Sequence, residues 1–431
     1  MLTYPTRRRL GSYVPQEATL ILNFEERRAV QSGKQINLQS IITFDRAGPA
    51  WGAGDGGVFR QHAANEMRLG RPGVGPEGVL MERQATNLIL RSRDMSSSAW
   101  TKSAMTISQV GVGLDGQEIV SRCTDGAAAG STSGKLSQAR PVATTNQWIT
   151  GSIYVRQLTG IRMRAYIGLL GGSSVKGGEA IIDTELGAVL SAQSGIVARI
   201  EPASMGFIRI CVSIRNDVGG NLCVMELSRE NDAAAPIVFD ADFAQMEISS
   251  RASSPILTVA SQADRYGDRL RINPLDDWFN PYEGTLYVEC SIGGAQENNR
   301  TIARLAGPGG SLEIGVGGST SSVDVLSIVG GSVQGSGSAA GYVNPPRRLR
   351  IAARYKANDF AFSISGVQTP YDGESLGTPR VIPIAGASAV PTYTNLEIGS
   401  NVGTIQADGT ISKLIYIPYA LDDARLAAAV L

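Results

Sequence analysis

Residues 147–158, QWITGSIYVRQL, decide the fold class of this chain. Between Ile149 and Arg156 apolar and polar residues alternate with a period of about two, which is typical of a β-strand with one buried face. Glycine pairs follow at distances typical of hairpin turns, at residues 171–172, 177–178 and 219–220. The stretch therefore predicts one strand of an antiparallel sheet that packs on a core.

Short apolar runs of the same kind continue on both sides of this strand. They fill residues 86–258, and a second series begins at residue 275, after the polar segment 260–271. The chain has 51 glycines and only 6% aromatic residues, a composition that favours short strands joined by tight turns. In two packed sheets, each strand has one face buried against the other sheet and one face in contact with solvent. We therefore predict an all-β protein with two antiparallel β-sandwich domains of the jelly-roll type.

A length of 431 residues exceeds what one hydrophobic core usually serves. We predict one sandwich at residues 86–260 and a second at residues 261–431. Residues 1–85 join an arginine cluster at 7–9 to turns rich in Gly and Pro, which predicts an irregular region and linker. Two interpretations of its first 45 residues stay open: a segment that attaches to another protein, or a flexible, solvated terminus.

The overall charge excludes some partners. The 39 basic residues balance the 39 acidic ones, so nothing draws the chain toward nucleic acid or an anionic membrane. We expect no transmembrane span and no secretion signal, since no apolar run is long enough for a span and the start of the sequence lacks an apolar stretch before a cleavage site.

Four cysteines are scattered without metal-binding spacing, at positions 123, 211, 223 and 290. We expect reduced, buried thiols. A disulfide between Cys211 and Cys223 stays open, because the two flank a predicted hairpin turn at residues 216–221.

Residues 76–102, PEGVLMERQATNLILRSRDMSSSAWTK, form a phrase found in one class of proteins. The phrase resembles "GLLIEEQATNLLLNSEDFSNAAWTK" of bacteriophage tail-fibre, tailspike and head-fibre proteins, where an N-terminal region meets a jelly-roll domain. The resemblance begins near Ile41, in ITFDRAGPAW and HAANEMRLG. It implies a carbohydrate-binding-module-like jelly roll at residues 86–260.

Two later segments resemble the concanavalin A-like lectin/glucanase superfamily in its laminin G-like form. Residues 350–366, RIAARYKANDFAFSISG, are similar to its paired central strands. Residues 409–426, GTISKLIYIPYALDDARL, are similar to its closing strand and short helix. The resemblance implies a lectin-like sandwich at residues 261–431.

Together these resemblances imply a virion structural protein of a tailed phage or gene transfer agent, assembled in the bacterial host cytoplasm. The expected function is adsorption as a fibre or spike that binds host-surface carbohydrate. Expected partners are other virion proteins at the N-terminal region, the host polysaccharide and two further copies in a homotrimer. Two alternatives are a polysaccharide depolymerase and an architectural collar, baseplate or head-decoration protein.

Catalytic residues are not evident in the sequence, and we expect no enzyme. His62 is the only histidine and stands without a nucleophile motif, so we interpret it as a solvated loop residue. Glycoside hydrolysis needs only two carboxylates. Asp240 and Asp242 would share one strand face, but Glu247 would face the other side of an ideal strand, and a structural role is preferred for all three.

Sugar binding on a sandwich needs an exposed aromatic ring with polar groups beside it. The candidate residues lie on predicted loops: Tyr371, Asp372, Glu374, Tyr393 and Asn395. Trp100, Trp148, Trp278 and Tyr282 are interpreted as packing residues.

No metal site or cofactor is expected from the spacing of the residues. The laminin G-like resemblance leaves calcium open, with oxygen ligands from Asp324, Asp359 and Asp372. Arg347, Arg348 and Arg350 have two interpretations: a charged strand edge that blocks further pairing, or contact with an acidic polysaccharide or partner.

Overall fold

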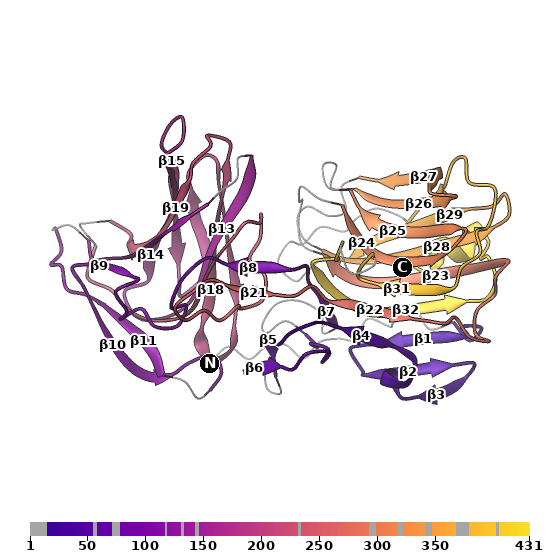
Figure 1. Ribbon diagram of the computed structural model, residues 1–431, viewed down its shortest axis with the longest axis horizontal. Coiled ribbons are helices and arrows are strands. Elements are labelled where there is room, and N and C mark those ends of the chain that lie inside the picture. The colour runs from indigo at the N-terminus through magenta and orange to yellow at the C-terminus, as the bar shows by residue number, and fades with distance from the viewer. Residues whose placement is uncertain are drawn as a thin grey trace. The chain divides into compact units, whose positions relative to one another are not determined.

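The computed structural model describes residues 15–54, 58–70, 78–116, 119–130, 133–142, 146–231, 234–292, 299–317, 322–340, 347–367, 379–401 and 405–431. They form two compact units (Figure 1). Unit 1 takes its residues from 1–44, 76–81 and 269–431, and unit 2 takes its residues from 45–75 and 82–268. The strands pair antiparallel throughout, so the predicted all-β sandwich fold is confirmed.

Unit 2 is a sandwich of two six-stranded sheets among the described residues. The first sheet, called sheet F, runs in the order β10 (Met105–Val112), β11 (Ile119–Asp125), β20 (Val238–Glu247), β13 (Gln147–Thr159), β18 (Ile208–Asn216) and β17 (Ile196–Pro202). The second, called sheet E, runs in the order β16 (Ala188–Ala192), β15 (Lys176–Asp183), β14 (Arg162–Leu170), β19 (Leu222–Arg229), β12 (Lys135–Pro141) and β9 (Thr101–Ser103). A 3-10 turn at Ser204–Gly206 connects β17 to β18.

The core of unit 2 lies between these sheets. Ile149, Ile153 and Val155 of β13 belong to this core, as the alternating sequence predicts. Trp100 is also buried in it, and its indole N–H donates to the Arg91 carbonyl at 3.1 Å. The other face of β13 is buried as well, since Thr150 is fully inaccessible. Residues outside the sandwich therefore cover a face that the sequence pattern leaves open to solvent.

Two small strand pairs complete unit 2. They join β5 (Ala50–Ala53) to β6 (Phe59–His62), and β8 (Ala85–Asn87) to β21 (Ala263–Arg265). Phe59 of β6 packs in a second apolar cluster with Tyr154 and Phe243, separate from the main core.

Unit 1 is a second sandwich. Its larger sheet, called sheet A, runs in the order β3 (Lys34–Ile36), β2 (Arg28–Gln31), β1 (Leu20–Asn23), β32 (Gly409–Ile417), β23 (Glu283–Ile292), β28 (Arg347–Lys356), β29 (Ala361–Val367) and β30 (Val381–Pro383), with β7 (Val79–Met81) also on β32. Its smaller sheet, called sheet B, runs in the order β27 (Ser332–Ala339), β26 (Val323–Val329), β25 (Gly310–Val316), β24 (Arg300–Gly307), β31 (Asn395–Ile398), β22 (Arg269–Ile272) and β4 (Thr43–Asp45).

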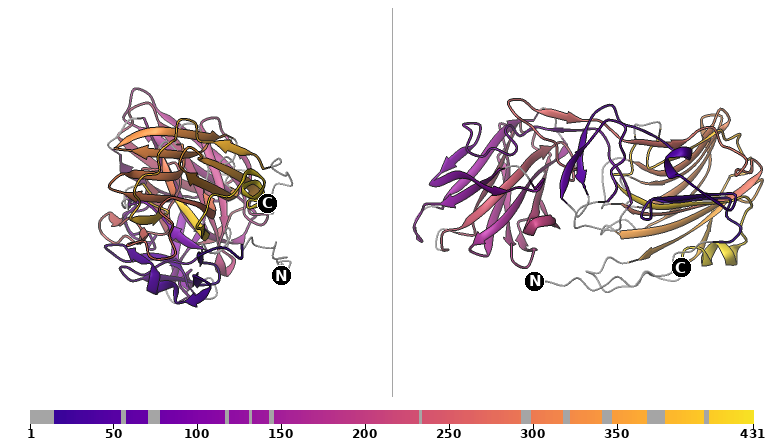
Figure 2. Two further views of the ribbon diagram at one scale, coloured as in Figure 1. Left: turned by 90° about the vertical axis from the view of Figure 1, so that its right-hand side faces the viewer. Right: turned by 90° about the horizontal axis from the view of Figure 1, so that it is seen from below.

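Two short helices belong to the described part of unit 1, α1 (Leu38–Ile41) and α2 (Asp423–Ala428). Helix α2 lies outside the sandwich, where Leu426 packs with Tyr287 and Ile415 of sheet A (Figure 2). Among the described residues, no helix is long and apolar enough to cross a membrane.

The N-terminal region differs from the expected irregular segment. Residues 20–36 supply three strands of sheet A, and β1 pairs with β32 through Ile21 opposite Ile415. This pairing joins positions almost 400 residues apart, so no local pattern in the sequence reveals it. The arginine cluster at 7–9 lies outside the described residues.

The cysteines agree with the expected reduced state, since all four are buried and free. Cys211 lies on β18 of sheet F and Cys223 on β19 of sheet E, so residues 216–221 connect two sheets and are not the turn of a hairpin. Burial raises the pKa of each of these thiols to about 12. The structure therefore does not join these two cysteines.

Candidate functional site

The predicted sugar-binding residues fall into two groups. Tyr371, Asp372 and Glu374 lie outside the described residues. Tyr393 is 5% exposed, and its ring centroid lies 5.4 Å from that of Tyr355 in an edge-to-face contact. Asn395 opens β31, and its Oδ1 is buried with no hydrogen-bond partner among the described residues. The Tyr393 ring is therefore used in packing.

Tyr393 belongs to an aromatic cluster inside unit 1. Trp278 is fully buried, as predicted, and lies 5.2 Å from Tyr416. Phe279 stacks on Tyr355 with ring centroids 6.4 Å apart. The cluster is a packed core next to the first residues of β23.

Tyr282 lies directly beside this cluster and does not join it. Its exposed fraction is 79%, so the interpretation of Tyr282 as a packing residue is wrong. Phe279 still belongs to the cluster, and β23 begins four residues later, at Glu283. An exposed aromatic ring of this size is the feature that a sugar face stacks on.

Asn280 holds the turn that carries Tyr282. Its side-chain oxygen accepts a bond from the Tyr282 backbone N–H at 3.0 Å, and its side-chain nitrogen donates to the Pro418 carbonyl at 2.7 Å. The hydroxyl of Tyr355 donates to the Asn280 carbonyl at 2.6 Å, and the Asn280 N–H donates to the hydroxyl of Tyr416 at 3.0 Å. The turn is thus bonded to the core, and Tyr282 is presented on a fixed support.

Polar groups lie next to Tyr282 in the chain. Glu283 forms an ion pair with Lys356 at 3.2 Å, and their side chains are 30% and 53% exposed. Charged groups of this kind bond sugar hydroxyls and fix the orientation of a stacked ring. The sequence contains the signal for this site in Asn280 and Pro281, an Asx-type turn directly before a strand.

The carboxylates of β20 differ from the ideal-strand prediction. Phe239 and Ala241 face the core, but so do Ala244 and Met246, so the alternation changes phase between residues 241 and 244. The pairing with β13 shifts by one residue at the same place, and Phe243 has a φ of 42°. This β-bulge turns the strand.

Because of the bulge, Glu247 shares the outer face of sheet F with Asp240 and Asp242. Each carboxylate has basic or hydroxyl partners. Asp242 accepts two bonds from Arg93, at 2.7 and 3.0 Å, and Asp240 accepts from Arg122 at 2.8 Å. Burial raises the pKa of Asp242 and of Glu247. Their contacts support the structural role that the sequence favours.

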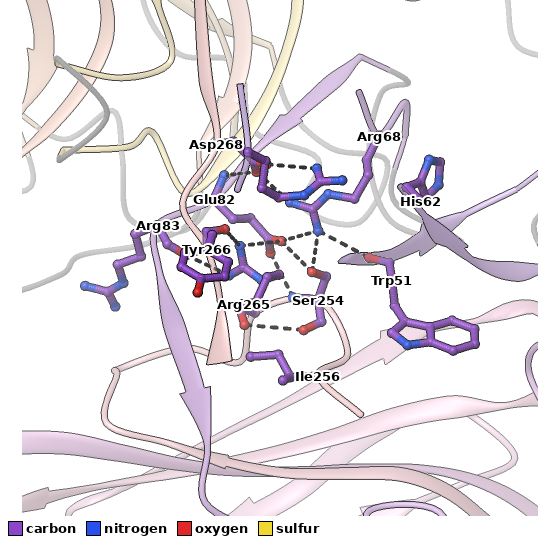
Figure 3. Close-up of polar contacts among 12 residues, drawn as sticks. Trp51, His62, Arg68, Glu82, Arg83, Ser254, Ile256, Arg265, Tyr266 and Asp268 are labelled. Atoms are coloured by element: carbon purple, nitrogen blue, oxygen red, sulfur yellow. Dashed lines mark hydrogen bonds and ion pairs between the residues drawn. The ribbon is translucent and has the colours of Figure 1, made fainter. Parts of the chain in front are cut away.

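An ion-pair network with four buried charged side chains lies in unit 2, near residues 82 and 268. Arg68 lies between Glu82 and Asp268 (Figure 3), with one guanidinium nitrogen 2.8 Å from Glu82 and the other 2.5 Å from Asp268. Ser254 donates from its hydroxyl to Glu82 at 2.6 Å, and Arg46 lies 3.2 Å from Asp268. We call these five residues the Arg68 network.

The Arg68 network occupies points where the chain passes from one unit to the other. Glu82 follows Met81, the last residue of a unit 1 segment, and Asp268 precedes Arg269, the first residue of the next. The Glu82 N–H donates to the Asp268 carboxylate at 2.9 Å, and the Asp268 N–H donates to the Glu82 carbonyl at 2.9 Å. The network fixes these two segments of unit 2 side by side.

His62 is not the solvated loop residue that the sequence suggests. It ends β6 and is 2% exposed, with Nε2 3.0 Å from the Ala53 carbonyl and Nδ1 3.2 Å from Glu66. Burial lowers its pKa. Pairing with β5 buries the ring, an effect of tertiary structure that the loop-like local sequence hides.

The calcium candidates do not assemble in the part of the chain that the structure describes. Asp359 pairs with Arg354 at 2.7 Å, and Asp324 accepts from the Ser322 hydroxyl at 2.8 Å. Asp372 lies outside the described residues. Among those described, no three His, Cys, Asp or Glu residues form a group that could hold a metal ion.

Arg348 and Arg350 do not lie at a sheet edge. Strand β28 pairs with β23 on one side and β29 on the other, so the interpretation of a charge-protected edge is wrong. Both side chains approach Glu289 of β23, Arg348 at 2.7 Å and Arg350 at 3.4 Å.

Comparisons with known proteins give the following similarities. No protein-family model matches the chain, and no curated protein matches it. A Trypanosoma rangeli sialidase bound to the inhibitor DANA is similar at a TM-score of 0.26 and 9% identity, over 73% of this chain and 66% of that chain. The tail fibre protein gp63.1 of an E. coli phage is similar at 0.21 and 9%, over 80% of this chain and 41% of that chain. A xylan β-1,4-xylosidase of Bacillus halodurans is similar at a TM-score of 0.21 and 7% identity, over 88% of this chain and 99% of that chain.

One expectation is corrected by these comparisons. Glycoside hydrolases, among them the sialidase and the xylosidase, are prominent in the set of similar structures, and the expectation that the chain is not an enzyme is withdrawn. At TM-scores this low, none of the similarities assigns a role to a residue of this chain. The chain spans less than two thirds of the sialidase and of the tail fibre.

Proposed function

We propose that this chain is a fibre or spike protein of a phage or phage-derived particle and binds host-surface carbohydrate through unit 1. The observation that supports carbohydrate binding is Tyr282, which is 79% exposed on a turn that Asn280 bonds to the aromatic core. The phage phrase at residues 76–102 supports the particle.

The residues of the phage phrase have architectural contacts. Glu82 belongs to the Arg68 network, Asn87 bonds to the Ala244 and Ile256 carbonyls, and Trp100 fills the core of unit 2. Because these residues form the start of the sandwich, the resemblance to phage proteins supports a shared structural module and does not indicate a shared ligand. Ligand choice then belongs to exposed residues such as Tyr282. Several copies on one particle would raise a weak affinity to useful avidity.

An array of bacterial surface polysaccharides tests the proposal, with the full chain and Tyr282→Ala compared on it. We expect the full chain to bind a subset of glycans and Tyr282→Ala to bind them about tenfold more weakly, since stacking contributes roughly 0.5–1.5 kcal/mol beyond buried area. Because Tyr282 is exposed, the free energy of unfolding should change by less than about 0.5 kcal/mol.

Two controls sharpen this experiment. Tyr282→Phe keeps the ring and should retain binding, and Val333→Ala removes an apolar side chain that is 57% exposed in the same unit and should have no effect. Equal binding by the full chain and Tyr282→Ala would refute the role of Tyr282. Release of oligosaccharide from a bound glycan, measured in the same samples, would identify the protein as a depolymerase.

A further inference from the structure

A group of charged residues shares the outer face of sheet A in unit 1. Glu289 of β23 lies opposite Lys413 on β32 and opposite Arg350 on β28. Arg348 lies two residues from Arg350 and therefore faces the same side of the sheet. Three cationic side chains thus surround one acid on one surface.

Both arginines form ion pairs with Glu289. The Nε of Arg348 lies 2.7 Å from Glu289, and its Nη2 donates to Glu25 at 3.2 Å. Arg350 lies 3.4 Å from Glu289 and also donates to the carbonyl of Leu431. Glu25 and Arg348 are each 29% exposed, so their ion pair lies at the surface.

Lys413 is different from both arginines. It is 3% exposed, and among the described residues it has neither a hydrogen-bond partner nor an ion pair. Burial lowers its pKa, although the negative charges of Glu289, Glu25 and Glu26 act in the opposite direction. Its stem is buried, but its ammonium is not among the buried side-chain atoms that lack a partner, so the ammonium reaches solvent at the end of the stem. An anion can approach the ammonium there and form a charge-assisted hydrogen bond with it.

We propose that Lys413 and Arg348 form a subsite for the anionic group of an acidic sugar. The ammonium of Lys413 supplies a point charge, and the fork of Arg348 supplies paired donors suited to a carboxylate, phosphate or sulfate. Arg348 exchanges its surface partner Glu25 for the ligand. The acidic sugar as ligand rests on the proposed carbohydrate binding.

The subsite is separate from Tyr282. Glu289 lies six residues along β23 from Glu283, which follows Tyr282, and this spacing corresponds to roughly 20 Å of strand. A single sugar unit therefore cannot reach both, and the two sites can be tested independently.

Titration of the full chain with D-glucuronate, inorganic phosphate and D-glucose, followed by calorimetry at low salt, tests the subsite. We expect glucuronate to bind, glucose not to bind at this site, and Lys413→Met to weaken glucuronate binding at least tenfold. Lys34→Met is the matched control, because Lys34 is an exposed lysine on β3 of the same sheet, and it should leave binding unchanged.

Arg348→Met is a second variant and should weaken binding by a similar factor, which protects the test against a folding defect at Lys413. Binding of glucuronate and phosphate with equal affinity would keep the anion subsite but remove its preference for a sugar. Absence of glucuronate binding, or equal binding by Lys413→Met, overturns the proposal. Tyr282→Ala should keep glucuronate binding, so a failure of the Tyr282 site and a failure of this subsite give different results.

Discussion

The two units treat buried charge differently. In unit 2, Arg68 lies between Glu82 and Asp268, and all three side chains are at least 98% buried. In unit 1, the residue Lys413 is 3% exposed, but the acid opposite it, Glu289, is bound by two arginines. In unit 2 the charges of the network pair with one another. In unit 1 the ammonium of Lys413 can pair with an additional anion.

This difference separates structural charge from candidate binding charge. A buried ion pair with good geometry costs little to keep but much to break, because removal of one partner leaves the other uncompensated. An unmatched buried charge costs stability in the free protein, and a cost of this kind is usually found where a ligand binds.

The largest expected effect is that of Arg68→Met. It leaves Glu82 and Asp268 buried with one fewer cation, so the free energy of unfolding should fall by about 3–5 kcal/mol. Urea denaturation, followed by fluorescence, measures the loss. Arg60→Met is the matched control, because the ion pair of Arg60 with Glu66 is exposed and should contribute at most about 1 kcal/mol. Equal losses in the two variants would mean that the Arg68 network is not the matched structural cluster described above.

A smaller effect is the difference between two variants at the bulge in β20, at Phe243. Phe243 has a φ of 42°, a conformation that strains any residue with a Cβ. Phe243→Ala should cost about 3–5 kcal/mol through lost packing, and Phe243→Gly should cost about 1 kcal/mol less.

The control for this prediction is Phe239, a fully buried residue of the same strand that is not among the residues with positive φ. There Ala should be more stable than Gly, because glycine only adds unfolded-state freedom. Thermal unfolding of the four variants measures both orders. The same order at both positions would show that the bulge is not strained.

The fold class could be predicted from the sequence because it depends on local alternation. Ile149, Ile153 and Val155 show which face of β13 packs in the core without reference to any other strand. The position of β1 could not be predicted, because Ile21 pairs with Ile415, close to the other end of the chain. The common face of Asp242 and Glu247 was hidden for a different reason: one residue in a positive-φ conformation changes the phase of the strand.

The candidate site was predictable only in part. A predicted loop suggested Tyr393 for sugar binding, but the loop folds over the aromatic core and buries the ring. Tyr282 was assigned to packing because it follows Trp278 and Phe279, which do pack. Exposure of one residue among packed neighbours is decided by a turn, and the bonds of Asn280 that fix this turn are tertiary.

The smallest expected effect is on the other side of the comparison, in Lys413→Met. Burial places the pKa of Lys413 below its ordinary value of about 10.4, so between these two values the folded state binds fewer protons than the unfolded state. The contribution of Lys413 to the stability of the unaltered protein should therefore rise as the pH increases between these two pKa values. This contribution should be lowest at a pH below both of them.

Methionine removes the cost of placing a charge at this position, and its side chain still fills the space of the lysine stem. Lys413→Met should thus be more stable than the unaltered protein at pH 7, by at most about 1 kcal/mol, and the gain should shrink as pH rises toward about 10.4. The difference in melting temperature between the two proteins, measured from pH 7 upward, cancels the contributions of the other titrating groups. A variant that is less stable than the unaltered protein at pH 7 would mean that Lys413 is matched in the folded state as Arg68 is, and the contrast between the two units would then disappear.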